Sequence, residues 1–337
     1  MNGGKKIRKI LVDVLGPVAC RIKRPRPPKN LPALVMTLLV RNEADIIRAN
    51  IDFHLRMGVD HIFVTDNGSV DGTREILKDY GSTGRLTVID EPGRNFSQAV
   101  WVNRMADMAY ERFGKCLIFH CDADEFWHSA SGNLAHELSS FPWVDCLQVK
   151  LLHVLPLHRN FEERFPDDAV VVVHKPFAGR GIAKDRGKRS FYLIENPQKV
   201  IYRAGGYMPH VRDGNHHLVD RKTYVTRPSE QILIYHFPLR GFGNFERKVM
   251  EGGSAIVSNP DLSPQTGWQW RKWYQEYLDG HLRATYRDLV LDEKEAGMLE
   301  KQGVLQINPE IRNVFFPSSS QHNENSTPPE RNPIRPV

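Results

Sequence analysis

The sequence predicts an α/β fold with a doubly wound, mostly parallel sheet, and two observations carry this prediction. From residue 34 to residue 127, short apolar runs rich in β-branched residues alternate with segments whose apolar residues recur at helical spacing. Such alternation is typical of the strands and helices that build a parallel sheet. Acidic and amide side chains follow each apolar run where it ends, and open α/β sheets bind ligands beyond the carboxyl ends of their strands. We therefore expect a polar crevice along one edge of the sheet.

The elements of this half can be placed in chain order. Strands are predicted over residues 34–40, 61–65, 85–89 and 116–121. The first helix has the inner stripe Ile47, Ile51 and Leu55 and ends at Gly58. The second helix is capped by Ser69 or Asp71 and runs through Leu77. The third helix opens at Ser97, and its predicted apolar side comprises Val100, Trp101, Met105 and Met108.

The most informative segment follows the fourth predicted strand. Asp122, Asp124 and Glu125 place three carboxylates within four residues, and their mutual repulsion requires a positive charge nearby. In an extended backbone Asp122 and Asp124 share one face, so both can reach one divalent cation. Replacing Asp124 is then expected to relieve repulsion and to leave stability unchanged or slightly higher. The alternative is a solvated turn, which rarely follows so apolar a strand.

Four motifs, taken in order, resemble a known family. They are V-R-N-E at residues 40–43, H-L-R-M-G-V at 54–59, D-N-G-S-V-D-G-T at 66–73 and D-A-D-E-F at 122–126. This set is similar to the family-2-like glycosyltransferases of GT-A fold, and most similar to the bacterial subgroup with V-[KR]-N-E, D-N-x-S-x-D-G-T and D-x-D-E-F. The resemblance covers about residues 33–140. It implies transfer of a sugar from a nucleotide-diphosphate donor, usually with Mn²⁺ or Mg²⁺ and with inversion.

The resemblance also implies roles for individual residues. Asp66 would contact the base or ribose of the donor, and Asp122 and Asp124 would contact the ribose and the metal-bound diphosphate. Arg41 and Glu43 would line the nucleotide pocket. Bacterial relatives often build surface glycans, so the acceptor implied is a glycan or a lipid-linked glycan in cell-surface polysaccharide or lipopolysaccharide synthesis.

The second half of the chain carries weaker signals. Strands are predicted over residues 170–174 and 231–236, and the stretch H-F-P-L-R at 236–240, followed by F-E-R-K at 245–248, is similar to one found in related enzymes. His236 is a candidate third metal ligand or diphosphate contact, with a hydrogen-bonded core histidine as the alternative. Arg240, Arg247 and Lys248 either neutralise phosphate or lie on a solvated helix face.

A glycosyl transfer needs a base to deprotonate the acceptor hydroxyl. Asp213, in a loop dense in histidine, is the predicted general base. Glu125, Glu163 and Glu195 are its competitors.

The chain as a whole divides into four predicted parts. Residues 1–30 form a basic leader or a membrane-surface segment, 31–145 a nucleotide-sugar-binding half, 146–317 a mixed acceptor-binding half with C-terminal helices, and 318–337 a disordered tail. The four cysteines show no C-x-x-C pairing, and the three that lie in or beside apolar strand-like segments are expected as reduced core residues of a cytoplasmic protein. We expect the enzyme in the cytoplasm, with residues 1–30 either against the anionic inner face of the membrane or simply a leader.

Other classes of protein remain as alternatives. The formal charge of +6 suits an anionic partner, but no interleaving of basic and aromatic residues indicates nucleic-acid binding. A phosphotransferase with D-x-D would carry that motif after its first strand, whereas here it follows the fourth. A non-catalytic nucleotide- or sugar-binding protein of the same fold is the remaining alternative, against which Asp66, Asp122 and Asp124 speak.

Overall fold

The structure is a computed structural model. It describes residues 30–92, 98–157, 165, 170–178, 190–205, 208–219, 223–259, 262, 267–307 and 311–316. The predicted leader, apart from residue 30, and the predicted C-terminal tail lie outside the described residues. Among the helices that are described, none has both the length and the apolar character that crossing a membrane requires.

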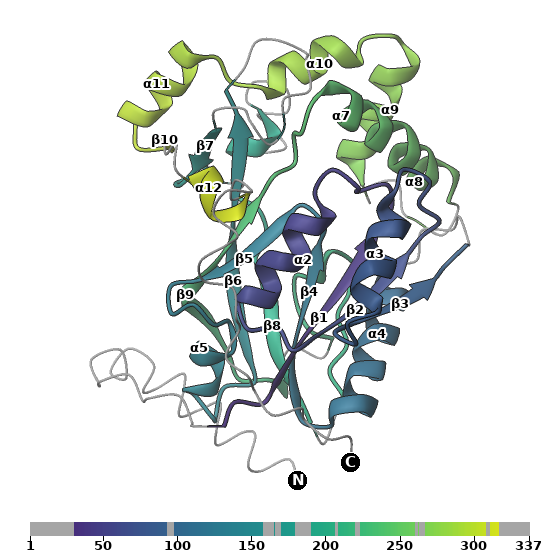
Figure 1. Cartoon of the computed structure of the whole chain (residues 1–337). Helices are drawn as coiled ribbons and strands as arrows, with labels where there is room; N and C mark the ends of the chain where they lie inside the picture. Colours follow the sequence, from purple (N-terminus) through teal and green to yellow (C-terminus); the bar gives the residue numbers. More distant parts are fainter. Residues whose placement is uncertain are drawn as a thin grey trace.

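The first half forms the parallel part of one sheet. Strands β1 (Ala33–Val40), β2 (His61–Asp66), β3 (Leu86–Asp90) and β4 (Cys116–Asp122) lie in the order β3-β2-β1-β4, and all three pairings are parallel. Helices α2 (Ile47–Arg56), α3 (Thr73–Gly81) and α4 (Gln98–Phe113) connect them (Figure 1). This confirms the predicted fold class.

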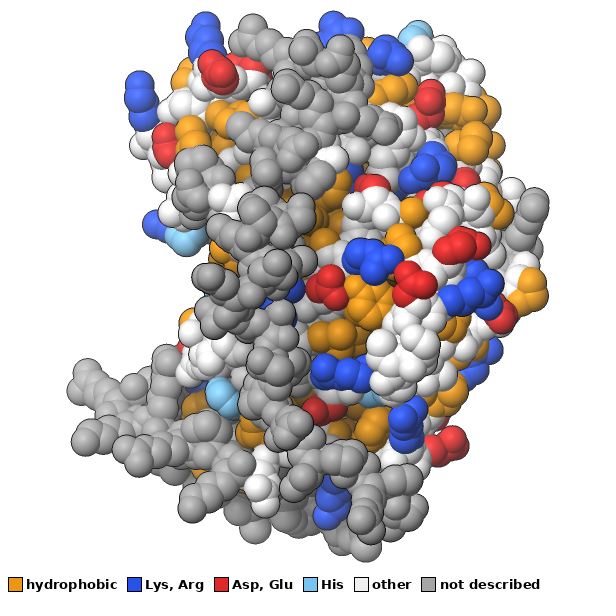
Figure 2. Space-filling model, in the orientation of Figure 1, with side chains coloured by type: hydrophobic (Ala, Val, Ile, Leu, Met, Phe, Trp, Pro, Cys, Tyr) orange, Lys and Arg blue, Asp and Glu red, His pale blue; other side chains and the backbone are white. Residues whose placement is uncertain are grey.

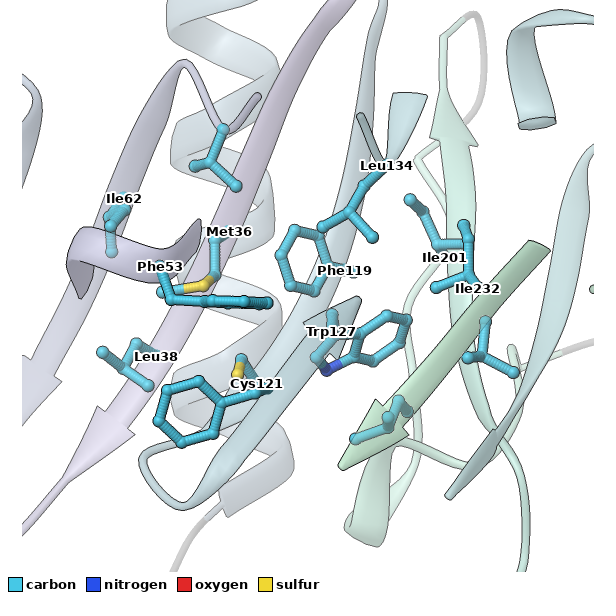
Figure 3. Packing of buried hydrophobic residues seen from close by; sticks show 14 of the residues in the cluster. Met36, Leu38, Phe53, Ile62, Phe119, Cys121, Trp127, Leu134, Ile201 and Ile232 are labelled. Atoms are coloured by element: carbon cyan, nitrogen blue, oxygen red, sulfur yellow. The ribbon is translucent and has the colours of Figure 1, made fainter. Parts of the chain in front are cut away.

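The two faces of this sheet are covered by different helices, because neighbouring side chains of a strand point to opposite faces. Leu34, Met36 and Leu38 of β1 belong to one core cluster with Ile47 and Ile51 of α2. Val35 belongs to a separate cluster with Val102, Met105 and Ala109 of α4. The first cluster continues through Phe119 and Trp127 to Ile201 and Ile232 of the second half (Figure 3). The sheet is therefore doubly wound, and one apolar layer joins the two halves of the sequence.

The second half extends the same sheet with mostly antiparallel strands. They are β5 (Glu125–Ser129), β6 (Cys146–Pro156), β7 (Val170–Val173), β8 (Lys199–Ala204), β9 (Thr226–His236) and β10 (Leu305–Ile307). Strand β8 pairs with β4, and the order continues β8-β6-β7-β10, while β9 pairs with both β5 and β6. Strands β6 and β8 were not predicted, because polar residues interrupt their apolar pattern, namely Gln148, Lys150 and His153 in β6 and Arg203 in β8.

Helices of the second half build a further core cluster at one end of the molecule (Figure 1). They are α7 (Phe242–Lys248), the π-helical segment η5 (Val249–Gly253), α9 (Trp268–Leu278), α10 (Leu282–Leu289) and α11 (Glu293–Lys301). Helix α8 (Ser254–Ser258) follows η5 directly along the chain. The short elements α5 (Ala135–Ser139), α12 (Ile311–Phe315), η2 (Phe191–Leu193) and η3 (Asp213–Asn215) complete the chain. Phe245, Trp273 and Tyr286 pack together in this cluster, so Trp273 is a core residue.

Two local predictions were wrong. The N-cap position of α3 is held by Gly72, with φ of 99°, and not by Ser69 or Asp71. Asp71 lies one residue earlier and accepts hydrogen bonds from the backbone nitrogen and the hydroxyl of Thr73, the first residue of the helix. Val100 is 67% exposed, because the buried stripe of α4 runs through Trp101, Met105 and Ala109 at spacings of four residues. The predicted buried thiols are confirmed for Cys116, Cys121 and Cys146.

Acidic and basic side chains are interspersed on the face shown in Figure 2. Arg48 of α2 and Asp79 of α3 form one exposed ion pair, at 3.0 Å, with side chains that are 54% and 65% exposed. A pair this exposed contributes little to stability, which makes it a useful control for the buried pairs described below.

Buried neutral histidines predict acid sensitivity. His120 lies between Thr37 Oγ1, 2.6 Å from its Nδ1, and the Tyr202 hydroxyl, 3.0 Å from its Nε2. Burial, helped by the charge of Lys199, lowers the pKa of His120 from 6.5 to about 3. Below pH 6.5 this histidine therefore binds a proton in the unfolded chain but stays neutral in the folded protein. The stability that is present above pH 6.5 is lost as the pH falls toward 3.

We expect His120→Gln to reduce this pH dependence by at most about 1.4 kcal/mol per pH unit between pH 6 and pH 4. Urea unfolding at several pH values measures it. The control is His281→Gln, because the His281 side chain is 71% exposed and its removal should leave the slope unchanged. Equal slopes in the His120→Gln variant and the wild type would contradict the assignment.

Candidate active site

The carboxyl ends of the parallel strands bring the predicted residues to one edge of the sheet. In the strand register Asp66 lies opposite Val40 on one side of β1, and Asp122 lies opposite Leu39 on the other. Asp90 lies opposite Asp66. Asp66 and Asp122 therefore flank β1 at the same edge, which is where open α/β sheets bind ligands.

The acidic turn between β4 and β5 is held from beneath by α2. The Asn50 side-chain amide donates to the carbonyl oxygens of Ala123, at 3.0 Å, and Glu125, at 2.7 Å. His54 bonds through Nδ1 to the Asn50 carbonyl at 2.9 Å, and its Nε2 accepts from the Trp127 backbone nitrogen at 3.1 Å. Burial lowers the pKa of His54 to about 3, so His54 stays neutral and can accept this bond. One buried amide thus fixes both ends of the turn.

Asn50→Leu keeps the approximate size of this side chain and removes both of its donors. We expect it to lower the free energy of unfolding by about 2–4 kcal/mol, because two buried carbonyl oxygens lose their partners. Urea denaturation measures this loss. Arg48→Leu, on the same helix but in an exposed pair, should change stability by less than about 1 kcal/mol. A loss in Asn50→Leu no larger than in the control would rule out the role of Asn50.

Asp124 is surrounded by Lys248, Arg240 and His236 of the second half. Its Oδ2 lies 2.9 Å from Lys248 Nζ, and its Oδ1 lies 3.4 Å from His236 Nε2. Arg240 Nη1 is 3.9 Å from Oδ2. Burial opposes ionisation here, but Lys248, His236 and Arg240 outweigh it and hold the pKa of Asp124 well below its ordinary value. Asp124 is therefore an anion.

Arg240 is fully buried and links three carboxylates. Its side chain is 0% exposed, pairs with Glu43, and lies 2.9 Å from Asp45 Oδ2 through Nε. Lys248 joins the same group at 3.0 Å from Glu43 Oε1. Burial raises the pKa of Asp45, against the opposing effect of Arg240. Arg240 and Lys248 are thus paired residues of the site, whereas Arg247 donates to the Asn42 carbonyl at 3.1 Å.

Asp122 and Glu125 share a different cation, Lys199 of β8. The Lys199 ammonium lies 2.7 Å from Asp122 Oδ2 and 2.6 Å from Glu125 Oε1. Burial and the neighbouring Asp122 charge raise the pKa of Glu125 to about 7, although Lys199 opposes the shift. Burial alone would lower the pKa of Lys199, but the two carboxylates raise it. Sequence reasoning missed Lys199 because β8 itself was not predicted.

Arg41 and Asn42 are held by Glu251 of the π-helical segment η5. Glu251 accepts from Arg41 Nε at 2.9 Å and from Asn42 Nδ2 at 3.0 Å. Asn42 has φ of 54°, a conformation that Asn tolerates better than most residues. Its backbone nitrogen donates to Ser69 Oγ at 3.0 Å, and its Oδ1 accepts from the Val70 nitrogen at 2.9 Å. Isolated π-helical turns often occur at functional sites. Here the contacts of Glu251 connect η5 to the predicted nucleotide pocket.

Asp66 is buried, and both of its carboxylate oxygens are paired, one with the loop that follows β2 and the other with α3. Its Oδ1 accepts from the Ser69 backbone nitrogen at 3.0 Å, and its Oδ2 lies 3.0 Å from Arg74 Nη1. Arg74 also pairs with Asp90. Contact between Asp66 and a ligand thus remains a prediction.

Asp213, the predicted general base, begins the short helix η3. Its side chain and the whole of Glu163 lie outside the described residues. The neighbouring loop reaches the site, because His216 Nδ1 lies 3.3 Å from the carbonyl oxygen of Gln198, the residue before Lys199. The role of Asp213 stays a prediction.

The predicted metal ligands are Asp122, Asp124 and His236. Within the described residues, no three His, Cys, Asp or Glu side chains are grouped closely enough to hold an ion by themselves. Mg²⁺, however, is commonly bound by one or two carboxylates together with substrate phosphates and water. Asp122 and Asp124 fit an ion of that kind only if the oxygens of a bound diphosphate supply further ligands.

Comparison with known proteins identifies the class of this enzyme. Residues 35–121 match the model of glycosyltransferase family 92, which is about a quarter of the chain. The chain is a glycosyltransferase, as its motifs predicted. The match is to family 92, so the predicted resemblance to family 2 is not confirmed. No curated protein resembles the chain in sequence.

Solved structures show only a distant likeness. The mannosyltransferase PcManGT from Pyrobaculum calidifontis, in complex with GDP-Man and Mn²⁺, is 13% identical with a TM-score of 0.39, over 89% of this chain and 88% of that one. Staphylococcus aureus TarS 1–349 in complex with UDP-GlcNAc is 14% identical with a TM-score of 0.37, over 84% and 83%. At these scores the likeness carries no conclusion about this chain.

Proposed function

We propose that this glycosyltransferase moves a sugar from a nucleotide-diphosphate donor to a glycan or lipid-linked acceptor, with inversion, in cell-surface polysaccharide or lipopolysaccharide synthesis. One observation carries the proposal. The acidic turn at Asp122–Glu125 lies at the carboxyl edge of the parallel strands, against buried cations from β8 and α7. An edge with paired charges of both signs suits an anionic ligand that also needs a cation.

The donor would lie along the carboxyl ends of β1, β2 and β4. Arg41, Glu43, Asp66 and Asp122 are the proposed contacts to the nucleotide. The Asp122 side chain, at 41% exposed, is open to a ligand, and the Arg41 side chain, at 35%, is partly open. Glu43 is deeply buried and paired with Arg240 and Lys248, so its contribution would be to orient these two cations.

A divalent cation, Mn²⁺ or Mg²⁺, is the proposed cofactor. Asp124 and Asp122 would hold it, and His236, the third ligand predicted from the sequence, lies beside Asp124. When bound, it would supply Lewis-acid stabilisation of the negative charge that builds on the departing diphosphate. Lys248 and Arg240 lie beside Asp124 and place two further positive charges at the same edge.

Deprotonation of the acceptor hydroxyl is assigned to Asp213 by proposal. Among its competitors, Glu125 has a pKa near 7, which suits a base. Its side chain is only 2% exposed and is held by Lys199, so it is poorly placed to reach an acceptor. The proposed location, the cytoplasm with residues 1–30 at an anionic membrane face, also rests on the sequence alone.

Thermal unfolding with a panel of UDP and GDP sugars tests the proposal. We expect one donor with Mn²⁺ to raise the melting temperature by more than the donor and Mn²⁺ do separately, since the aspartates need diphosphate oxygens to complete the site. A ligand at 100 times its Kd adds about 2.7 kcal/mol of stability. The same measurement is made on the variant Asp124→Asn. Its matched control is Asp79→Asn, because the Asp79 side chain is 65% exposed.

Two results would contradict the proposal. If excess EDTA leaves the stabilisation by a donor unchanged, the divalent cation has no part in donor binding, and that part of the proposal is wrong. Binding of a donor with Mn²⁺ but without turnover, for any acceptor or water, would indicate a non-catalytic binding protein.

A further inference from the structure

A line of buried and half-buried polar side chains leads from Asn196 to the acidic turn. His153 of β6 and His236 of β9 are neighbours in the strand register, and Glu125 of β5 is the neighbour of His236 on its other side. The Nδ1 atoms of the two histidines are 3.0 Å apart. Asn196 Nδ2 lies 2.5 Å from His153 Nε2, and His236 Nε2 lies 3.4 Å from Asp124 Oδ1.

The orientation of the Asn196 amide is fixed by the backbone. Its Nδ2 donates to the carbonyl oxygen of Ile194 at 3.0 Å. A carbonyl oxygen only accepts hydrogen bonds, so the side-chain atom facing it must be the amide nitrogen and not the oxygen. The same nitrogen has a second hydrogen, and this hydrogen points to His153 Nε2.

The positions of the protons in both rings follow from this donor. Because Asn196 donates to it, His153 Nε2 carries no proton, and the one ring proton sits on Nδ1. His153 Nδ1–H then donates to His236 Nδ1, which must be the unprotonated nitrogen of that ring. The proton of a neutral His236 is therefore on Nε2, facing Asp124.

We propose that Asn196 and His153 are positioning residues that hold His236 in its Nε2–H tautomer. In this tautomer His236 offers the site a hydrogen-bond donor and withholds the lone pair that a metal ion would need. The natural acceptors of this donor are Asp124 and, in the proposed function on which this step rests, an oxygen of the diphosphate. The cation is left to the aspartates, in contrast to the third-ligand role that the sequence predicted for His236.

The opposite tautomer conflicts with the surroundings. For His236 Nε2 to bind an ion, its proton would move to Nδ1 and donate to His153 Nδ1. The His153 proton would then sit on Nε2, where it would face the Asn196 amide hydrogen across 2.5 Å. Two donors would oppose each other in a buried place, since His153 is 4% exposed.

The variant Asn196→Asp tests this proposal, because it exchanges donor and acceptor in each hydrogen bond from residue 196 to His236. A carboxylate accepts from His153 Nε2–H, so His153 Nδ1 becomes the acceptor and His236 carries its proton on Nδ1. Long-range ¹⁵N–¹H correlation spectra of the full-length protein without nucleotide report the tautomer directly. We expect His236 to be protonated on Nε2 in the wild type and on Nδ1 in Asn196→Asp, with Mn²⁺ bound about 10-fold or more tightly in the variant. Asn313→Asp, at an exposed position, controls for the added charge.

Three results would overturn the proposal: a wild-type His236 protonated on Nδ1, a tautomer unchanged in Asn196→Asp, or a Mn²⁺ affinity that matches the Asn313→Asp control. If Asn196→Asp fails to fold, the wild-type spectrum still decides. The spectra need no donor, so a failed search for a nucleotide sugar would count against the proposed function and not against the tautomer.

Discussion

Arg240→Leu is expected to lower the free energy of unfolding by about 3–5 kcal/mol, because it removes one partner from a buried group of ion pairs. Arg240 is 0% exposed and pairs with Glu43 and Asp45. Removing its charge leaves Glu43, whose side chain is 10% exposed, paired with Lys248 alone of these two cations, and it takes away the cation that lies 2.9 Å from Asp45. Urea denaturation at pH 7 measures the loss.

Arg48→Leu is the matched control, because it removes the same charge from an exposed pair and should cost less than about 1 kcal/mol. The variant Arg240→Lys should fall between the two, since it keeps the charge but loses the second nitrogen that bridges Glu43 and Asp45. If Arg240→Leu is no less stable than Arg48→Leu, the buried group is not held together by Arg240.

Asp124→Asn is expected to reduce sugar transfer by on the order of 10²–10³-fold, because several kcal/mol of transition-state stabilisation depend on the charge at this position. Donor hydrolysis and transfer with Mn²⁺ measure it, with Asp79→Asn as the control. Equal activity in the variant, or full wild-type activity in excess EDTA, would remove Asp124 from the reaction.

The same variant should also be less stable than the wild type, which reverses the expectation from the sequence. Three carboxylates in four residues predicted mutual repulsion, so loss of one was expected to be harmless. In the structure Asp124 lies 2.9 Å from Lys248 and 3.9 Å from Arg240. Asp124→Asn therefore leaves buried cations with weaker partners.

The first half of the fold was predictable because its signals are local. Each parallel strand is a short apolar run, and each is followed by its own polar loop, so the order of elements and the acidic edge could both be predicted from neighbouring residues. The exact phase of α4 was not predicted, because small residues such as Ala106 and Ala109 line its buried side and carry little hydrophobic signal.

The cationic half of the site was much less predictable. The acidic cluster implied a nearby positive charge, and the sequence suggested a metal ion. The structure supplies three cations from far along the chain: Lys199 lies 77 residues from Asp122, Lys248 lies 124 residues from Asp124, and Arg240 lies 197 residues from Glu43. Arg240 and Lys248 could be named only as alternatives to a solvated helix face, and Lys199 follows no motif at all. Long-range charge pairing leaves no periodic trace in a sequence.

The pairing of Glu43 with Arg240, 197 residues apart, also has a consequence for synthesis. Protein chains emerge from the ribosome with the N-terminal half first, so β1 to β4 can assemble while α7 has not yet been made. Until Arg240 and Lys248 arrive, Glu43 and Asp124 remain hydrated anions on an uncovered sheet edge, and their repulsion opposes tight closure of that edge. During synthesis the acidic turn is therefore hydrated until the later helices cover it, and its charges oppose aggregation of the N-terminal half in that interval.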